Sequence, residues 1–487
     1  MMGVGLGVFM ATLDTSIVNI SLPTLAEQFN TSFAIVQWVV LSYTLVVTAL
    51  MLSAARLGDM LDKKKLYLVG LTLFTIGSFL CGLSPTVGWL IGFRALQGLG
   101  ATLTQALGMA IITEIFPVQE RGRALGIIGG VVSVGIAVGP PIGGILIGLV
   151  GWRAVFLVNV PVGILAALVV SRFVPSSIPA RKNQQFDRVG AVVLLATLAA
   201  YALGMTLGQQ VGFENGAVIV LLVLALLGLV TFVLLERRTG QPMVDLSLFR
   251  NVLFSLNLVM GFLVFIVMAG NFIVPFFLEL VQGYSTEQVG ILMMSMPIAM
   301  GLVAPWAGSL SDRFGSRGIS LVGLLIIVGG CLALGTLNSH TPWWGFVLRM
   351  VPFGVGMGFF QSPNNSAIMG AAPRQQLGIA SGLLSLSRTL GQTTGLPLMG
   401  AVFTAQVLAV GQLPAGMDAT EAPAEVLVSG VTDTYQIAAF FILASTMLAG
   451  LALWIDTRRQ HAIRLAAGQA YEHFRPLEDE ADSDCSS

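Results

Sequence analysis

Three observations on the sequence predict an all-α polytopic membrane protein of fourteen transmembrane helices. Apolar residues make up 55% of the 487-residue chain and charged residues only 10%, with a mean hydropathy of +0.87. A soluble domain carries about 25% charged residues, so this chain cannot cover a water-facing surface of ordinary size. Fourteen apolar runs are each long enough to cross about 30 Å of hydrocarbon. A sequence repeat with an offset of 253 residues then divides these runs into two copies.

The predicted spans follow one another along almost the whole chain. The first follows two methionines directly, without the basic segment of a cleavable signal peptide, so we expect it to be retained. The run 251–280 contains Pro275, which can break a helix. The spans are predicted near residues 3–23, 34–56, 66–83, 87–113, 122–149, 153–174, 187–208, 214–236, 251–280, 288–309, 317–337, 343–369, 377–405 and 433–457.

The loop charges predict the orientation in the membrane. Loop arginines and lysines lie almost entirely on one side, whereas the opposite loops carry mainly acids such as Glu27, Glu287 and Asp418. The positive-inside rule therefore places both termini in the cytoplasm. We expect a multi-pass protein of a bacterial inner (plasma) membrane. Lys+Arg and Asp+Glu are 24 each, so net charge gives no indication of a nucleic-acid partner.

The repeat predicts two similar six-helix halves. Segment 57–64 recurs as 310–317, with Asp59 matching Asp312 at an offset of 253. Two copies of six spans leave the pair 187–208 and 214–236 between them, which we expect at the periphery. Two halves in the same orientation suit a transporter that rocks around a site at the bilayer midplane. The predicted units are an N-terminal half at 1–174, two inserted linker helices at 175–250, a C-terminal half at 251–457 and a disordered cytoplasmic tail at 458–487.

Four segments carry a family resemblance: 13–23 in the first span, 57–64 after the second, 94–100 in the fourth and 139–144 in the fifth. Their sequences are Leu-Asp-Thr-Ser-Ile-Val-Asn-Ile-Ser-Leu-Pro, Leu-Gly-Asp-Met-Leu-Asp-Lys-Lys, Arg-Ala-Leu-Gln-Gly-Leu-Gly and Gly-Pro-Pro-Ile-Gly-Gly. With these motifs the chain resembles the major facilitator superfamily, specifically its fourteen-span drug:proton antiporter branch, over about residues 3–457.

The resemblance implies two conformational features. The first is a cytoplasmic latch, with Asp59 as its hub, that acts between outward- and inward-facing states. The second is a tight seam in the fifth span, where small residues let helix backbones approach closely. The alternative interpretations are an ordinary solvated loop and a simple helix crossing. The latch candidates are Asp59, Lys63, Lys64, Asp312, Arg313 and Arg317, and the seam candidates are Gly135, Gly139, Pro140, Pro141, Gly143 and Gly144.

Asp14, Arg94, Glu279 and Arg388 lie inside predicted spans and are the candidates for proton coupling. At 1.5 Å per residue, Asp14 lies about 13 Å from the outer end of the first span and Arg94 about 10 Å deep in the fourth. Burial favours a protonated carboxyl group, whereas a nearby Arg94 favours the ionised one, so Asp14 could load and release a proton. The alternative is a permanent ion pair that only positions helices.

The other two charged candidates leave more alternatives open. Glu279 could receive protons or attract a cation, or it could be a water-exposed carboxylate at the rim. Arg388 could hold the helices of the second half together, or pair with a carboxylate during the transport cycle.

Uncharged polar and aromatic residues are predicted to line the substrate cavity, because an amide that faced lipid would be unsatisfied. Twenty methionines and 28 phenylalanines add adaptable apolar surface that suits promiscuous binding. The cavity candidates are Asn19, Trp38, Tyr43, Gln97, Gln105, Asn257, Asn271, Gln361, Asn364 and Asn365.

The sequence thus predicts a proton-coupled secondary antiporter that exports small amphipathic or cationic compounds, as in multidrug efflux and antibiotic resistance. The alternatives are a dedicated exporter of a metabolite or lipid-like compound, and a membrane sensor or assembly subunit that does not transport. No Gly-Lys dipeptide occurs, so no P-loop and no ATP-driven step are expected. Cys81, Cys331 and Cys485 show no paired spacing and the three histidines are scattered, so neither an enzyme, a metal nor a cofactor is predicted. The expected partners are protons, a small-molecule substrate and the lipid bilayer, with the protein acting as a monomer.

Overall fold

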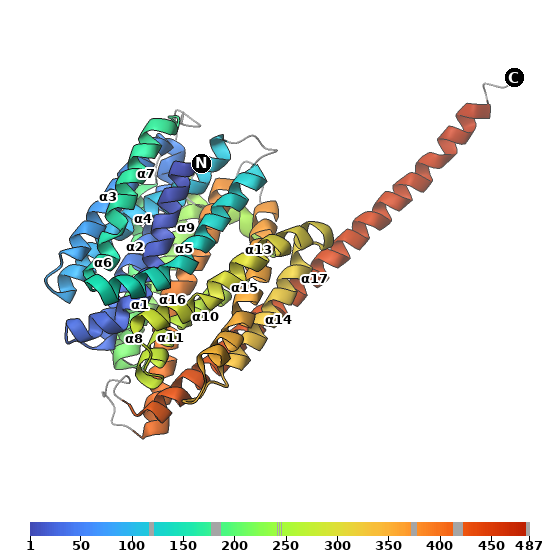
Figure 1. The fold of residues 1–487 in the computed structure, drawn as a ribbon. Coiled ribbons are helices and arrows are strands. Elements are labelled where there is room, and N and C mark those ends of the chain that lie inside the picture. The colour runs from blue at the N-terminus through green and yellow to red at the C-terminus, as the bar shows by residue number, and fades with distance from the viewer. Residues whose placement is uncertain are drawn as a thin grey trace.

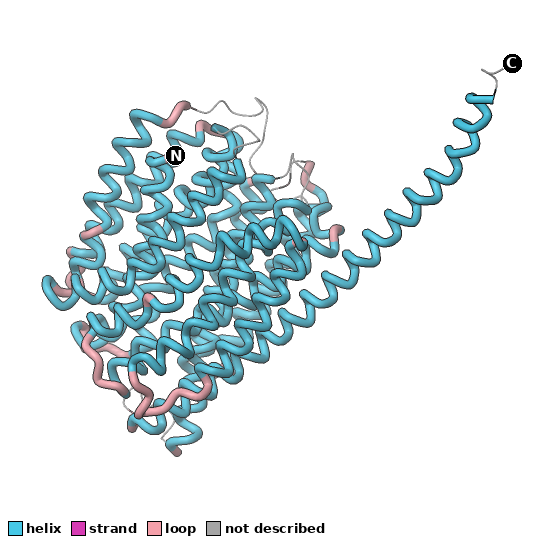
Figure 2. Tube along the Cα trace, turned by 45° about the vertical axis from the view of Figure 1, so that its right-hand side comes forward, coloured by secondary structure: helices cyan, strands magenta, loops and turns pink. Residues whose placement is uncertain are grey.

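Fourteen membrane-length helices run back and forth through the molecule. The computed structural model describes residues 1–115, 121–176, 187–240, 242, 244, 246–371, 377–412 and 422–483. Within these residues every regular element is a helix and none is a strand (Figure 2). Fourteen stretches of the described chain are long and apolar enough to cross a membrane, which confirms the predicted fold class.

Some of these spans consist of more than one helical segment. The first part of the chain forms α1 (Met2–Gln28), α2 (Phe33–Met60), α3 (Lys63–Gly82), α4 (Val87–Ile115), α5 (Arg121–Val150), α6 (Arg153–Leu157) and α7 (Asn159–Phe173), followed by the inserted α8 (Arg188–Val211) and α9 (Gly216–Arg238). The remainder forms η1 (Leu246–Arg250), α10 (Val252–Ala269), η2 (Gly270–Phe272), α11 (Ile273–Phe276), η3 (Phe277–Val281), α12 (Thr286–Met293), α13 (Ser295–Phe314), α14 (Ser316–Leu334), α15 (Trp343–Ala371), α16 (Leu377–Gly411) and α17 (Ala424–Ser483).

The ninth span is irregular, as Pro275 suggested. The α-helix changes to a 3-10 turn at Gly270–Phe272, and a π-helical turn follows at Phe277–Val281. Pro275 has no backbone N–H to donate to the preceding turn, so regular α-helix cannot continue unchanged through this region.

The helices before and after the inserted pair pack in the same pattern. Helix α1 packs on α5, α2 on α4 and α3 on α4; in the second part α10 packs on α16, α13 on α15 and α14 on α15. Figure 1 shows the two groups side by side, the first in blue to teal and the second in yellow to red. Each packed helix pair in the first group therefore corresponds to a packed pair in the second group, in the order that the sequence repeat predicts.

Glycines set the spacing of the α3–α4 crossing. A Cβ atom on Gly100 would lie 2.3 Å from the Phe74 nitrogen, and one on Gly77 would lie 2.7 Å from the Gln97 Cα. The α14–α15 crossing uses matching positions, where a Cβ on Gly330 would lie 2.7 Å from the Phe353 nitrogen. Because each neighbour is backbone, any side chain would force the two helices apart.

Gly100→Val is therefore expected to destabilise the protein. Overpacking a close contact costs about 1–3 kcal/mol, and the contact here is with backbone that cannot rotate away. Thermal unfolding of the purified protein in detergent should show a clear fall in melting temperature. Gly92→Val is the matched control, because Gly92 lies on the same helix with no heavy atom within 4 Å of its added Cβ. Equal melting temperatures for the two variants would contradict the expected close crossing.

The inserted helices lie on the outside of the bundle. Helix α8 packs against both α2 and α16, and α9 packs against α8. The Tyr201 hydroxyl is hydrogen-bonded to that of Thr394 on α16 at 2.8 Å. Much of α9 is exposed apolar surface, for example Val220 at 57% and Leu226 at 61%, as a lipid-facing helix requires. This packing agrees with the expected peripheral position.

The C-terminal tail differs from the sequence-based expectation of disorder at 458–487. Helix α17 continues beyond the membrane-length segment to Ser483 and projects away from the bundle (Figure 1). A helix that is already nucleated within the bundle propagates more easily than a new helix can start. Residues 462–472 include four alanines and one each of Leu, Gln, Glu and Arg, which favour such propagation.

Candidate functional site

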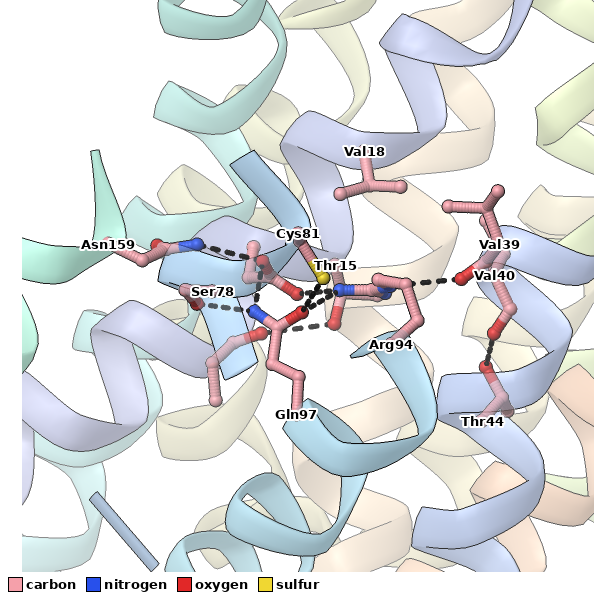
Figure 3. A network of polar contacts seen from close by, with 12 residues as sticks. Thr15, Val18, Val39, Val40, Thr44, Ser78, Cys81, Arg94, Gln97 and Asn159 are labelled. Carbon is pink, nitrogen blue, oxygen red and sulfur yellow. Dashed lines mark hydrogen bonds and ion pairs between the residues drawn. The ribbon is translucent and has the colours of Figure 1, made fainter. Parts of the chain in front are cut away.

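Asp14 lies in the middle of α1 and is completely buried. Its Oδ2 accepts a hydrogen bond from Arg94 Nη1 at 2.6 Å. Its Oδ1 accepts one from Gln97 Nε2 at 2.8 Å and another from Asn159 Nδ2, also at 2.8 Å (Figure 3). The two charges that the sequence places at similar depth are thus in contact, and two amides complete the carboxylate's surroundings.

Arg94 connects the carboxylate to α2. Its Nε donates to the Val39 carbonyl at 2.9 Å, and its Nη1 also donates to Gln97 Oε1 at 2.7 Å. The guanidinium carbon lies 4.2 Å from the centre of the Tyr43 ring, a favourable position for a cation over an aromatic face. Arg94 is therefore held by a carboxylate, an amide, a carbonyl and a ring at once.

Gln97 connects the pair to α3. Its Nε2 also donates to Ser78 Oγ at 2.6 Å, and Cys81 Sγ donates weakly to its Oε1 at 3.8 Å. The network therefore joins α1, α2, α3, α4 and α7 (Figure 3). A buried charge pair with this many partners has most of its desolvation cost offset by hydrogen bonds.

Sequence reasoning did not select Ser78 or Asn159, and it considered Cys81 only as a cysteine. Asn159 is an amide within the sixth apolar run, and the argument that selected Gln97 applies to it equally. Ser78 and Cys81 could not be selected from the sequence. Small polar residues are common in membrane helices, where their side chains usually hydrogen-bond to the backbone of their own helix.

The other charged candidates lie away from this network. Glu279 is in η3 near the outer end of its span, and its Oε1 has no hydrogen-bond partner among the described residues. Arg388 on α16 donates to the Asn365 side chain on α15 and lies 5.4 Å from the Phe265 ring. Among the ion pairs of the described residues, none joins either group to Asp14 or Arg94.

The predicted cavity amides are in varied surroundings. Asn271 is enclosed in the C-terminal group, where it donates to Met296 Sδ at 3.2 Å and accepts from the Tyr435 hydroxyl at 2.8 Å. Asn257 donates to the Leu253 carbonyl of its own helix at 2.6 Å. These two therefore stabilise packing in the structure. In contrast, two buried Oδ1 atoms have no partner in the described part of the chain, namely that of Asn19 and that of Asn364. The side chain of Asn364 is buried, whereas those of Asn19, Trp38, Gln105 and Gln361 are partly buried.

The basic residues of the first latch segment contact their own half. Lys63 Nζ lies 3.1 Å from Glu114 Oε2 at the end of α4. Lys64 Nζ donates to the Ser171 carbonyl on α7 at 2.9 Å. Asp62 caps α3 by accepting from the Lys64 nitrogen at 3.0 Å.

The second latch segment behaves similarly. Arg317, the repeat counterpart of Lys64, forms an ion pair with Asp456 on α17. Arg313 is exposed. Asp59 and Asp312 lie on α2 and α13, but their side chains fall outside the described residues. The described latch contacts therefore tie neighbouring helices within one half, and a latch between the halves stays a prediction.

The glycine-rich α5 packs on two partners. Its inner face lies on α1, where a Cβ on Gly139 would be 2.5 Å from Ser16 Cβ; Gly135 and Gly143 make similarly close approaches to α1. Its outer end lies on α12, where a Cβ on Gly144 would be 2.6 Å from the Thr286 carbonyl oxygen. From the other side, a Cβ on Gly290 would be 2.5 Å from the Pro140 carbonyl oxygen. The outer end of α5 therefore closes tightly against the second group of helices.

The described residues contain no group of three or more His, Cys, Asp or Glu side chains that could hold a metal ion. An all-helical bundle of fourteen spans around a buried, hydrogen-bonded ion pair is typical of a polytopic membrane transporter. Residues 4–396 match the family model of the Major Facilitator Superfamily, and the chain belongs to this family.

Several curated relatives support this assignment. The chain is 36% identical over 411 residues to the riboflavin transporter RibZ of Clostridioides difficile (strain 630), which covers 84% of this chain and 88% of that protein. It is 34% identical over 403 residues to the multidrug resistance protein Stp of Mycobacterium tuberculosis (strain CDC 1551 / Oshkosh), with coverage of 82% and 75%. The chain is thus a transporter of the bacterial inner membrane and not an enzyme.

A solved structure shares the fold. The crystal structure of a bacterial homologue of the human lysosomal transporter Spinster, in an inward-facing and unoccupied conformation, superimposes with a TM-score of 0.66. The match covers 93% of this chain and 95% of that one at 16% sequence identity. The fourteen spans and the drug-resistance relatives also fit the predicted fourteen-span branch of the family.

Proposed function

We propose that this protein is a proton-coupled antiporter that exports small amphipathic compounds from the cytoplasm by alternating access, acting as a monomer. The observation that carries the proposal is the completely buried Asp14 carboxylate, held at 2.6 Å from Arg94 inside the membrane. Charges in this environment are costly to maintain, and they most often serve ion or proton pathways. Relatives that are named multidrug resistance proteins support the export of compounds foreign to the cell.

The hydrogen bonds around Asp14 suggest how proton binding is linked to movement. Arg94, Gln97 and Asn159 all donate to the carboxylate. A proton added to Oδ1 would therefore meet a donor instead of an acceptor, because Gln97 and Asn159 occupy both of its lone-pair sites. Protonation of this oxygen requires one of these two partners to withdraw or turn, and each belongs to a helix other than α1.

Asn159 is the partner best able to turn. Arg94 is also fixed to α2 and Gln97 to α3, whereas the Asn159 Oδ1 is buried without a hydrogen-bond partner in the described structure. A half-turn of its amide would replace the donor Nδ2 with this oxygen, which can accept a hydrogen bond from a protonated Asp14. Asn159 then acts as a sensor of the proton at the junction of α1 and α7.

Coupling to the substrate is indirect in this proposal. The simplest direct coupling would be competition between a cationic substrate and a proton for the deprotonated Asp14. In the structure Asp14 is fully enclosed, so a cation would first have to displace Arg94 or an amide. We therefore assign the coupling to rearrangement of the helices around the ion pair.

A pH-gradient experiment tests the proposal. Purified protein in proteoliposomes should move a fluorescent amphipathic dye only when a proton gradient is imposed, with the opposite proton flux visible to a trapped pH indicator. A protonophore should stop both fluxes. Dye movement that ignores the gradient would instead indicate a uniporter, and this outcome would reject antiport.

A dedicated exporter is the second candidate, because the relative with 36% identity is named a riboflavin transporter. The same liposomes can distinguish the two. Several unrelated dyes should move for a multidrug exporter, whereas a dedicated exporter should move riboflavin or one related compound and leave the dyes untouched.

A further inference from the structure

Arg388 lies on the side of α16 that no neighbouring helix fully covers. Ser387 is hydrogen-bonded to α10, Thr393 to α2 and Thr394 to α8. At about 100° per residue, Ser387 and Thr394 both point about 100–120° to one side of Arg388, and Thr393 points about 140° to the other side. Arg388 itself contacts Asn365 on α15 and the Phe265 ring on α10, and it stays partly exposed.

The surroundings of Arg388 differ sharply from those of Arg94. A guanidinium group has five N–H donors. Asn365 is the one hydrogen-bond acceptor of Arg388 in the described part of the chain, and no described carboxylate forms an ion pair with it. Arg94 has a carboxylate, an amide and a carbonyl. Arg388 is therefore a cation inside a membrane span that has donors to spare and lacks a counter-ion of its own among the described residues.

An unpaired acceptor lies next in the chain to Asn365, the hydrogen-bond partner of this cation. Asn364 is only 2% exposed, and its Oδ1 has no hydrogen-bond partner among the described residues. A Cβ on Gly261 would lie 3.6 Å from both Asn364 Nδ2 and Ser387 Oγ, which places Asn364 beside the residue that precedes Arg388. A buried polar atom without a partner is costly, so this oxygen also requires a hydrogen-bond donor.

We propose that Arg388, Asn364 and Asn365 form a binding subsite for an anionic oxygen group, such as a carboxylate, on the transported compound. The guanidinium binds the anion, and Asn364 Oδ1 accepts a hydrogen bond from a neighbouring N–H or O–H of the same compound. This inference rests on the proposed export function and narrows its substrate class to organic anions and zwitterions. It replaces the cation preference that the sequence suggested.

The position of Arg388 suits a compound that enters from the cytoplasm. The residue lies eleven positions after Leu377, where α16 begins on the side that the loop charges assign to the cytoplasm. At 1.5 Å per residue this is about 16 Å along a helix of 35 residues. An anionic group arriving from that side would reach Arg388 before the middle of the bundle.

Two matched pairs of dyes test the subsite. Rhodamine 110 carries a carboxylate that rhodamine 123 has as a methyl ester, and fluorescein differs from its methyl ester in the same way. Binding is measured by fluorescence polarisation on purified protein in nanodiscs, without a gradient. We expect the acid of each pair to bind at least about tenfold more tightly than its ester, because a bidentate, charge-assisted hydrogen bond between arginine and a carboxylate is among the strongest polar contacts.

Three variants locate the effect. Arg388→Gln should reduce the acid-to-ester ratio to about one. Asn365→Asp, which is nearly isosteric and supplies an internal counter-ion, should do the same while keeping the arginine, so a folding defect of the first variant cannot account for both. Arg349→Gln is the control, because Arg349 is hydrogen-bonded to Thr336 and Gly345 in the same half. It should keep the wild-type ratio.

Four outcomes would each overturn the subsite. They are a wild-type acid-to-ester ratio near one, tighter binding of the esters, failure of the acids to bind, and an acid-to-ester ratio that is unchanged by Arg388→Gln. Because the assay uses no gradient, it is independent of proton coupling. Dye selectivity without gradient-driven flux would reject antiport alone, and gradient-driven flux without selectivity would reject the subsite alone.

Discussion

Asp14→Asn is expected to abolish proton-driven export and to leave a folded protein. Asparagine cannot exchange a proton, so flux driven by a pH gradient should fall to the level of empty liposomes. Removing one partner of a buried ion pair costs about 3–5 kcal/mol. The amide oxygen of the variant can still accept from Arg94, and Arg94 keeps its bonds to Val39 and Gln97, so we expect a loss at or below this range. The melting temperature should fall, with folding retained.

A double variant separates the proton role from a purely structural ion pair. In Asp14→Asn/Arg94→Gln neither member of the pair keeps a charge, so stability should recover relative to the single variant. If the pair only positions helices, transport should recover too. If Asp14 carries the proton, flux stays absent in both variants. Gradient-driven export by the double variant would therefore refute the proton role of Asp14.

A companion variant tests the proposed proton sensor. Asn159→Leu removes both the donor and the unpaired acceptor beside Asp14 while leaving the contact with Arg94 intact. Dye binding should persist, but the ratio of protons to dye moved should change, because protonation no longer requires a turn of this amide. A structural role alone would lower stability without changing that ratio.

Gly144→Val is expected to prevent the outer ends of the two halves from closing. The added Cβ would lie 2.6 Å from the Thr286 carbonyl oxygen and 2.9 Å from Glu287 Cα, and both atoms belong to the α12 backbone. Overpacking of this kind costs about 1–3 kcal/mol. A change of 1.4 kcal/mol is about tenfold in an equilibrium constant, so the population closed on the outside should fall by about that factor.

Labelling from the outer face measures this shift. A cysteine introduced as Ile142→Cys on α5, in a background without reactive native thiols, should react at least about tenfold faster with an impermeant maleimide in the Gly144→Val variant. Export should slow in parallel. Gly130→Val is the control on the same helix, because no heavy atom lies within 4 Å of its added Cβ. Identical labelling rates in all three proteins would show that this contact does not close the outer side.

The number of spans and the contact of Asp14 with Arg94 could be predicted from sequence for a simple reason. Apolar runs of membrane length have few alternative structures. The rise per residue then fixes the depth of each charge, which leaves few possible partners for a buried carboxylate. Both predictions depend on position along one axis only.

Properties that depend on rotation about a helix axis were not accessible in the same way. The sequence identified a seam on α5, but not that Gly139 approaches α1 while Gly144 approaches α12. It identified Asn271 as a cavity amide, whereas Tyr435 and Met296 enclose it. Asn159 could have been selected as an amide within a predicted span, but its contact with Asp14 on α1 depends on how α7 packs against α1.

The placement of α8 has a consequence for compounds dissolved in the bilayer. Helix α8 packs on both α2 and α16, so it covers the seam at which these two helices meet. A lipophilic molecule in the inner leaflet that approaches this seam is blocked by α8. The α5–α13 seam has no such cover among the main packing partners of α8 and α9 in the described chain. Lateral access from lipid is therefore obstructed by α8 at the α2–α16 seam, whereas α8 and α9 do not obstruct it at the α5–α13 seam in the described chain.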